Sequence, residues 1–431
     1  MKLKKITLLI FTAVFVSISC SSETEAGRAQ KAFEKKDYGR VLKITGVPPL
    51  DDFKNWGSEN YKFGSKARDP QKNNAELADE NILLSQKNKK IELMLLSMQK
   101  VKDIRLSDYI AAWYEYFAIT DIHIRFASYL RNTTDDTIIV IPAQTGNMID
   151  FRLSCYKRLW TDAYRLLENN FVKTETTVFC LDRAPAFLID ATNSIIYGTS
   201  NRIEYASLLS NEANRINNKT TAFLFSFCSG KIYDKSGSEY RAQALEQFHY
   251  AMNSAQTPAH YDYALWYYLT LNKKNSLRDA LDSTREYAST WFDSTWYDDF
   301  LDDISKTMLE NQLWDTYYSM YTFILPYASD VINSKYAYIA GRLIQEQLII
   351  HSKTTDNAIE QAFQTAWHSS DGQLYYRLMA ADKLHISSKQ ILQELTHKNE
   401  NWNIKADKNT IKTIENLFKT QNFESIHYIY T

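Results

Sequence analysis

Apolar residues recur along most of the chain at the three- and four-residue spacing of an amphipathic helix. In residues 26–44, Ala29, Ala32 and Phe33 fall on one face, and a polar turn separates them from Val41 and Leu42. This pattern predicts a pair of short helices at the start of the folded region.

The same spacing predicts a long series of further helices. They cover residues 76–84, 91–101, 106–130, 149–169, 203–216, 240–255, 259–271, 276–291, 296–310, 312–325, 335–350, 358–367, 373–384, 389–397 and 410–419. Residues 46–74 are polar and contain Pro48, Pro49 and Gly57, which predicts a surface loop. Residues 137–142 are apolar and mostly β-branched, and the pattern leaves open a short strand or the start of a buried helix.

Composition strengthens the helical prediction. The 431 residues include only 11 Gly and 7 Pro, whereas average usage of glycine alone is about 7%. Folds rich in sheets need many glycine-containing turns, because glycine adopts positive φ without steric cost. We therefore predict an all-α protein that forms a helical-repeat solenoid, or superhelix. The repeat is degenerate, so one large irregular helical domain is the alternative.

The N-terminus resembles an export signal. Lys2, Lys4 and Lys5 precede a short apolar stretch over residues 6–18, which is shorter than the roughly 20 residues that span a bilayer. The stretch ends in Ser-Ile-Ser before Cys20, which is similar to a relaxed bacterial lipobox, although Ser17 replaces the usual Leu. An ordinary signal peptide with an incidental cysteine is the alternative.

We therefore predict four segments: a signal peptide over 1–19, a lipidated tether over 20–25, an N-terminal helical region over 26–235 and a C-terminal helical-repeat region over 236–431. Lipidation of Cys20 would anchor the chain to a membrane of the bacterial cell envelope, at the outer membrane or the periplasmic face. The five residues of tether after Cys20 would keep the folded part near the bilayer.

Charge and cysteine content limit the partners and sites that the chain can be expected to have. The chain has 50 basic and 51 acidic residues, and this balance argues against a nucleic-acid partner. The cysteines Cys155, Cys180 and Cys228 lack metal-site spacing and have apolar or aromatic neighbours, which favours buried thiols, although one disulfide stays open.

Three strings in the second half carry a family resemblance. They are Ala-Leu-Trp-Tyr-Tyr at 264–268, Tyr-Ala-Tyr-Ile-Ala-Gly-Arg-Leu at 336–343 and Tyr-Tyr-Arg-Leu-Met-Ala-Ala-Asp-Lys-Leu at 375–384. In order and spacing, they resemble the helical superhelix of the soluble lytic transglycosylase family. The pair of helices over 26–44 is also similar to half of a tetratricopeptide unit. The resemblance implies a peptidoglycan-related function, with the aromatic residues serving either as core or as a sugar-stacking platform.

The strings of that family's catalytic domain, a Glu-Ser motif and a Gly-Leu-Met-Gln segment, are not found together. Glu424-Ser425 beside His427 is the nearest match, and it lies too close to Thr431 for a substrate cleft to follow. We therefore expect a non-catalytic relative and assign no catalytic residue, cofactor or metal. Cys20 is the only site residue that we predict.

Acidic pairs and histidines suggest no other site. Asp298-Asp299 and Asp302-Asp303 place carboxylates at i and i+4 of a helix, where a solvated face is the expected role. The eight histidines are scattered, and neither an HExxH motif nor a phosphate-binding loop occurs.

The predicted function is an envelope scaffold that binds peptidoglycan or a protein partner. The alternatives are a lytic-transglycosylase-type peptidoglycan-processing protein, truncated or with its catalytic part elsewhere, and a glycan- or solute-capture lipoprotein of a transport system.

Overall fold

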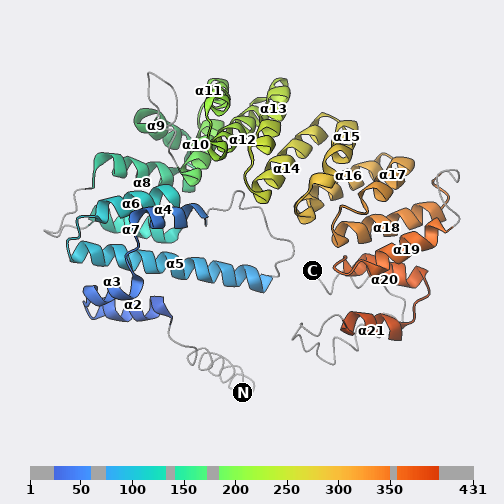
Figure 1. The fold of residues 1–431 in the computed structure, drawn as a ribbon, viewed down its shortest axis with the longest axis horizontal. Coiled ribbons are helices and arrows are strands. Elements are labelled where there is room, and N and C mark those ends of the chain that lie inside the picture. Colours follow the sequence, from blue (N-terminus) through green and yellow to red (C-terminus); the bar gives the residue numbers. More distant parts are fainter. Residues whose placement is uncertain (1–23, 60–73, 133–140, 172–183, 350–356, 398–431) are drawn as a thin grey trace, which may run out of the picture. The chain divides into compact units, whose positions relative to one another are not determined.

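A computed structural model describes residues 24–59, 74–132, 141–171, 184–349 and 357–397. Every secondary-structure element in these ranges is helical (Figure 1). The all-α prediction is therefore confirmed, while the tetratricopeptide character of the repeat stays a prediction. Residues 137–140 of the candidate strand lie outside the described ranges. No helix among the described residues has the length and apolar character needed to cross a membrane.

The chain divides into an N-terminal unit, Met1–Tyr240, and a C-terminal unit, Arg241–Thr431. The helices of the N-terminal unit are α2 (Glu25–Glu34), α3 (Tyr38–Thr45), α4 (Leu50–Glu59), α5 (Asn74–Lys100), α6 (Leu106–Tyr116), α7 (Asp121–Asn132), α8 (Ala143–Tyr156), α9 (Trp160–Phe171), α10 (Pro185–Gly198), α11 (Arg202–Arg215) and α12 (Lys219–Ser236). The short 3-10 helix η1 (Ser238–Tyr240) follows them.

The first helices pack on α5. Ala29 and Ala32 of α2, Val41 of α3 and Leu93 of α5 form one buried apolar cluster. Thr24 caps α2 by accepting a hydrogen bond from the Gly27 amide at 3.2 Å. The pair of short helices predicted over residues 26–44 is therefore present.

A buried arginine joins three helices of the same unit. Arg152 of α8 is only 1% exposed, and its guanidinium donates to the carbonyl oxygens of Phe117, at 2.6 Å, and Ala186. It also lies 2.7 Å from the Asp190 carboxylate of α10. Because a buried charge is tolerated only when it is paired and hydrogen-bonded, Arg152 fixes α8 against α10 and the end of α6.

The C-terminal unit contains α13 (Arg241–Ser254), α14 (Pro258–Asn275), α15 (Leu277–Tyr287), α16 (Asp298–Glu310), α17 (Trp314–Ile324), α18 (Asp330–Gln345), α19 (Ala358–His368), α20 (Leu374–Lys383) and α21 (Ser388–His397). The 3-10 helices η2 (Ala288–Thr290) and η3 (Ser294–Tyr297) lie between α15 and α16. Helices α14, α16, α18 and α20 contact one another in succession, and α17 and α19 each pack on the members of this row that flank them in sequence. This arrangement is solenoid-like.

Bonds between neighbouring repeats recur at similar sequence separations. Tyr336 donates to the Leu301 carbonyl at 2.7 Å, across 35 residues, and Tyr297 donates to Asp262 at 2.8 Å, also across 35 residues. Ser370 donates to Asp330 at 2.7 Å across 40 residues. These separations reveal a repeat length that the degenerate sequence pattern conceals.

Many helices end in the same turn, which uses a residue other than glycine. In each such turn the second residue after the helix has φ between 55° and 60°, and its amide and the next one bond back to the helix, as in a Schellman motif. These left-handed residues are Lys36, Lys102, Arg158, Gln312, Gln347 and His385. The low glycine count therefore does not prevent sharp turns between short helices.

These turns and other local features correct several predicted boundaries. The helix predicted over 106–130 is two helices, α6 and α7, and that predicted over 149–169 is divided into α8 and α9 by the turn at Arg158. Conversely, α5 continues through the predicted gap between 84 and 91, and α4 lies within the predicted loop. Gly57 allows that packing, since a Cβ there would lie 2.6 Å from the Phe117 ring. Helices α10 and α12 were not predicted.

Candidate functional site

Helix α19 is positioned by a close contact with α18. A Cβ placed on Gly341 of α18 would lie 2.7 Å from the Phe363 ring, so glycine permits the approach of the two helices. Ala362, Phe363, Ala366 and Trp367 are buried against the neighbouring helices. The opposite, polar side of α19 therefore faces solvent.

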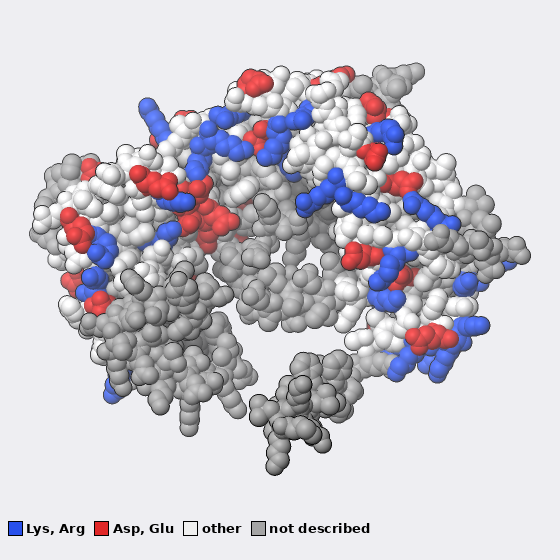
Figure 2. All heavy atoms as spheres, turned by 180° about the vertical axis from the view of Figure 1, so that it is seen from behind, with Lys and Arg blue, Asp and Glu red and all other residues white. Residues whose placement is uncertain are grey.

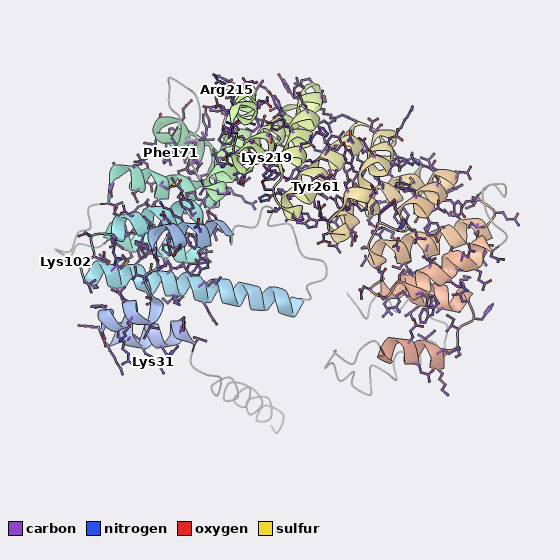
Figure 3. All side chains as sticks on the ribbon, in the orientation of Figure 1. Lys31, Lys102, Phe171, Arg215, Lys219 and Tyr261 are labelled. Atoms are coloured by element: carbon purple, nitrogen blue, oxygen red, sulfur yellow. The ribbon has the colours of Figure 1, made fainter. Side chains whose placement is uncertain are left out.

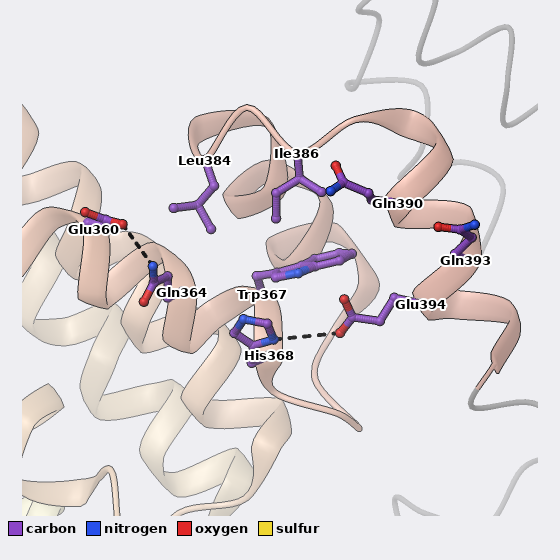
Figure 4. A pocket seen from close by; sticks show the side chains of 9 residues that line it. All are labelled: Glu360, Gln364, Trp367, His368, Leu384, Ile386, Gln390, Gln393 and Glu394. Carbon is purple, nitrogen blue, oxygen red and sulfur yellow. Dashed lines mark hydrogen bonds and ion pairs between the residues drawn. The ribbon is translucent and has the colours of Figure 1, made fainter.

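A hollow of about 470 Å³ lies between α19, α21 and the turn after α20 (Figure 4). Its apolar part is formed by Trp367, Leu384 and Ile386. Its polar part consists of side-chain amides, carboxylates and an imidazole, contributed by Glu360, Gln364, His368, Gln390, Gln393 and Glu394. This hollow is called the α21 hollow below.

A second hollow, of about 530 Å³, lies on the other side of α19, against α17. Tyr318, Tyr321 and Leu325 line it from α17 and its C-terminal cap, and Gln361 and Thr365 line it from α19. Gln364 and His368 line both hollows. The α17 hollow and the α21 hollow therefore share one polar ridge on α19.

Two interactions define the polar edge of the α21 hollow. The Gln364 side-chain amide donates to the Glu360 carboxylate at 3.0 Å, and His368 Nδ1 lies 3.8 Å from Glu394 Oε1 of α21 (Figure 4). The His368 side chain is 66% exposed and that of Glu394 is 30% exposed. Both contacts are accessible to water, so a ligand can replace them without exposing core residues.

Arg377 fixes the position of Trp367, which forms the floor of the α21 hollow. Arg377 of α20 is buried, and its guanidinium lies 5.5 Å from the centre of the Trp367 ring. Arg377 also donates to the carbonyl oxygens of Trp367, at 3.2 Å, and Ser370, at 3.1 Å. These bonds fix the turn between α19 and α20.

The α17 hollow presents phenol groups in their protonated form. Burial raises the pKa of Tyr318 and, together with a weaker effect of the Tyr318 charge, the pKa of Tyr321. Both hydroxyl groups therefore keep their protons at neutral pH. Amides, hydroxyls, carboxylates and an imidazole beside aromatic and aliphatic carbon form a surface suited to hydrogen bonding of a polyhydroxylated ligand.

Of the seven aromatic side chains in the resemblance strings, two lie in the core. Tyr336 is fully buried and Tyr338 is 7% exposed, which confirms the core role for these residues. Trp266, Tyr267, Tyr268 and Tyr376 are half-buried, and Tyr375 is exposed. None of these seven side chains lines either hollow.

The predicted lipidation site, Cys20, lies outside the described residues, as do Cys180, Glu424, Ser425 and His427. Cys155 and Cys228 are buried, and neither forms a disulfide. Burial raises the pKa of both thiols.

Three of the four carboxylates on α16 lie on a solvated face, as predicted: Asp299 and Asp303 are exposed, and the Asp302 side chain is 51% exposed. Asp302 is paired with Lys335 and Asp303 with Lys273. Asp298 is 9% exposed and accepts a 2.6 Å hydrogen bond from Ser329. Asp298 is therefore the exception to the predicted solvated face, while Asp302 and Asp303 also join α16 to α18 and α14 from that face.

The residues of the hollows were missed by the sequence reasoning. Glu360, Gln364 and His368 are spaced four apart on α19, so the polar side of the helix was visible in the sequence. What the sequence lacked was the position of α17 and α21, whose residues complete the hollows. Within the described ranges, no group of three or more His, Cys, Asp or Glu residues is arranged to hold a metal ion.

Comparisons with family models, with curated proteins and with solved structures find no match to this chain.

Proposed function

We propose that this protein is a cell-envelope lipoprotein, anchored through Cys20, whose C-terminal unit is a non-catalytic scaffold that binds peptidoglycan. The two hollows beside α19 are the proposed binding surface. The observation that carries this proposal is the polar ridge of Gln364 and His368, which lines both hollows.

A glycan strand suits this surface for two reasons. Adjoining hollows on both sides of one helix suit an extended ligand better than a compact one. Their amide, hydroxyl and carboxylate groups match the hydroxyl and acetamido groups of an amino-sugar strand, which both donate and accept hydrogen bonds. The resemblance of the strings at 264–268, 336–343 and 375–384 to the lytic transglycosylase superhelix favours the same ligand class.

The binding test uses the chain from Ser21 to Thr431 mixed with purified peptidoglycan sacculi, and it measures the sedimented fraction against sacculus concentration. We expect Gln364→Ala/His368→Ala to weaken binding about tenfold, since each lost hydrogen bond is worth about 0.5–1.5 kcal/mol. Both residues are exposed, so the double variant should remain folded.

A matched control is available in the same unit. Gln243 and His249 are also exposed, on α13 and away from both hollows, and Gln243→Ala/His249→Ala should bind as the unmodified chain does. Absence of binding, or equal effects of the two double variants, would contradict the proposed site. Release of anhydro-muropeptides would replace the scaffold proposal with lytic transglycosylase activity.

Lipidation is tested separately with full-length protein in bacteria. We expect labelled palmitate to be incorporated into the unmodified protein and not into Cys20→Ala. Labelling of Cys20→Ala would contradict lipidation at this residue.

A further inference from the structure

The turn between α5 and α6 exposes two apolar side chains. Ile104 is 96% exposed, more than any other large hydrophobic residue that the structure describes, and Val101 is 47% exposed. Single exposed hydrophobic residues are common on protein surfaces. Two of them within four residues, at the projecting end of a long helix, form a distinct apolar tip.

The turn is held in one conformation by its own hydrogen bonds. The amides of Lys102 and Asp103 bond back to the last turn of α5 at 3.0 and 2.9 Å. The Arg105 guanidinium donates hydrogen bonds of 3.0 and 2.7 Å to the Asp103 carboxylate, and this interaction lowers the pKa of Asp103. Ile104, between these two residues, is therefore presented to solvent by a fixed backbone.

Basic side chains surround the tip. Lys100 and Lys102 adjoin it, and neither forms an ion pair with a described residue. Lys102 marks this end of α5 in Figure 3. The charge of Asp103 is compensated within the turn by Arg105, so the two lysines supply the excess charge there.

The turn after α2 adds two more cations at the same end. Glu25 contacts Lys90 at 2.6 Å, and Ala32, further along α2, packs in the same cluster as Leu93, further along α5. The two helices therefore run in the same direction. The exposed pair at the end of α2, residues 35–36, is Lys-Lys, and Figure 2 shows basic side chains with acidic ones among them at its lower right, over α2 and α3.

This end carries five cations and four acids, a net charge of +1; the cations are Lys35, Lys36, Lys100, Lys102 and Arg105, and the acids are Glu34, Asp37, Asp103 and Asp108. Lysines at a helix C-terminus also interact favourably with the helix dipole, which accounts for Lys100 and Lys102 in part. That role does not account for the exposed Ile104, whose contact with water is unfavourable in the isolated molecule.

We propose that this basic, apolar-tipped end of the N-terminal unit docks on the surface of an anionic phospholipid bilayer. Ile104 and Val101 insert at the boundary between headgroups and acyl chains, and the lysines contact the headgroups, as interfacial membrane-binding segments do. The inference goes beyond the proposed scaffold function and does not require lipidation.

The test uses the chain from Ser21 to Thr431, which lacks Cys20 and retains every described residue. Its partition onto vesicles containing phosphatidylglycerol is measured by sedimentation and compared with partition onto phosphatidylcholine vesicles. We expect preference for the anionic vesicles and about a tenfold loss in Ile104→Ser, from the apolar surface that no longer inserts. Lys100→Gln/Lys102→Gln should lose about 25-fold, because each cation near an anionic surface contributes about fivefold.

The matched control is Leu348→Ser. Leu348 is 45% exposed in the turn after α18 and lies one residue after the left-handed Gln347, whereas Ile104 lies two residues after Lys102. It is therefore an exposed apolar residue of a turn of the same kind, without the lysines that adjoin Ile104. This variant should partition as the unmodified chain does. Absence of vesicle binding, equal binding to both lipids, or equal binding by Ile104→Ser and the unmodified chain would overturn the inference. Ile104→Ser should still bind sacculi, so failure of this inference is distinguishable from failure of the scaffold proposal.

Discussion

Removal of the Asp262 carboxylate should destabilise the C-terminal unit strongly. Asp262 of α14 is 1% exposed. It accepts hydrogen bonds from the amides of Phe292, at 3.2 Å, and Asp293, at 2.9 Å, and from the Tyr297 hydroxyl, at 2.8 Å. These bonds fix the segment between α15 and α16, and thus one repeat on the next.

The magnitude follows from what Asp262→Ala leaves unpaired. The buried Tyr297 hydroxyl loses its partner at a cost of about 1–3 kcal/mol. The two part-buried amides cost about 1 kcal/mol each, because water reaches them in part. Burial also raises the pKa of Asp262, so removing the charge restores some lost solvation. The net expected loss is about 3 kcal/mol of unfolding free energy.

Thermal and urea unfolding of the chain from Ser21 to Thr431, followed by circular dichroism, measures this loss. At about 2–4 °C per kcal/mol for a unit of this size, the melting temperature of the C-terminal unit should fall by about 10 °C. Asp282→Ala is the control, because its contacts with Arg278 and Arg285 are exposed ion pairs and are worth less than about 1 kcal/mol.

A double-mutant cycle isolates the interaction itself. Tyr297→Phe should cost about 1–1.5 kcal/mol in the unmodified chain and much less in Asp262→Ala, since the partner is already absent. A loss below about 0.5 kcal/mol in Asp262→Ala, or additive losses in the double variant, would refute the reasoning.

Three further predictions concern single residues. Burial raises the pKa of Asp298 to about 6 from an ordinary value of 3.8, so the contribution of Asp298 to stability is greatest below pH 3.8 and falls as the pH rises through 6. Asp298→Asn should remove this decline. A difference in unfolding free energy between the two proteins that does not change from pH 4.5 to 7.5 would contradict the prediction. Gln312 has φ of 57°, so Gln312→Gly should raise the unfolding free energy by about 1 kcal/mol in urea titrations, and destabilisation would show that the side chain has another role. Cys155 and Cys228 are buried with raised pKa values, so both thiols should resist a thiol reagent until the protein is unfolded, and mass spectrometry that finds them rapidly modified in the native chain would contradict their burial.

The fold class was predictable because its signal is spread over the whole chain. Helical spacing and the low glycine count each indicated helices, and no single residue had to be interpreted correctly. Helix α12 was missed for the opposite reason. Residues 222–230 are buried without interruption, so that helix has no polar face and therefore no amphipathic pattern.

The boundaries between helices depended on features that the sequence does not display. Lys102, Arg158 and Gln347 adopt the left-handed conformation at helix ends, although lysine, arginine and glutamine are good helix formers. Tertiary packing imposes these turns against local preference. Because no glycine marks these helix ends, the sequence pattern predicted longer helices than the protein has.

The candidate site could be predicted only in part. The polar face of α19 is evident from the spacing of Glu360, Gln364 and His368, but the hollows also need Tyr318 of α17 and Glu394 of α21. These residues come together through stacking of repeats whose period the sequence conceals. The role of Asp298 was obscured similarly, because its partner, Ser329, lies 31 residues away.

Hydrogen exchange measured with and without soluble peptidoglycan fragments tests the central claim most directly. If the ridge of Gln364 and His368 binds the glycan, amides of α19 and of the facing parts of α17 and α21 should exchange more slowly in the complex, while α13 should be unaffected. Slower exchange confined to other helices, or no change at saturating fragment concentration, would contradict the assignment of these hollows as the peptidoglycan-binding surface.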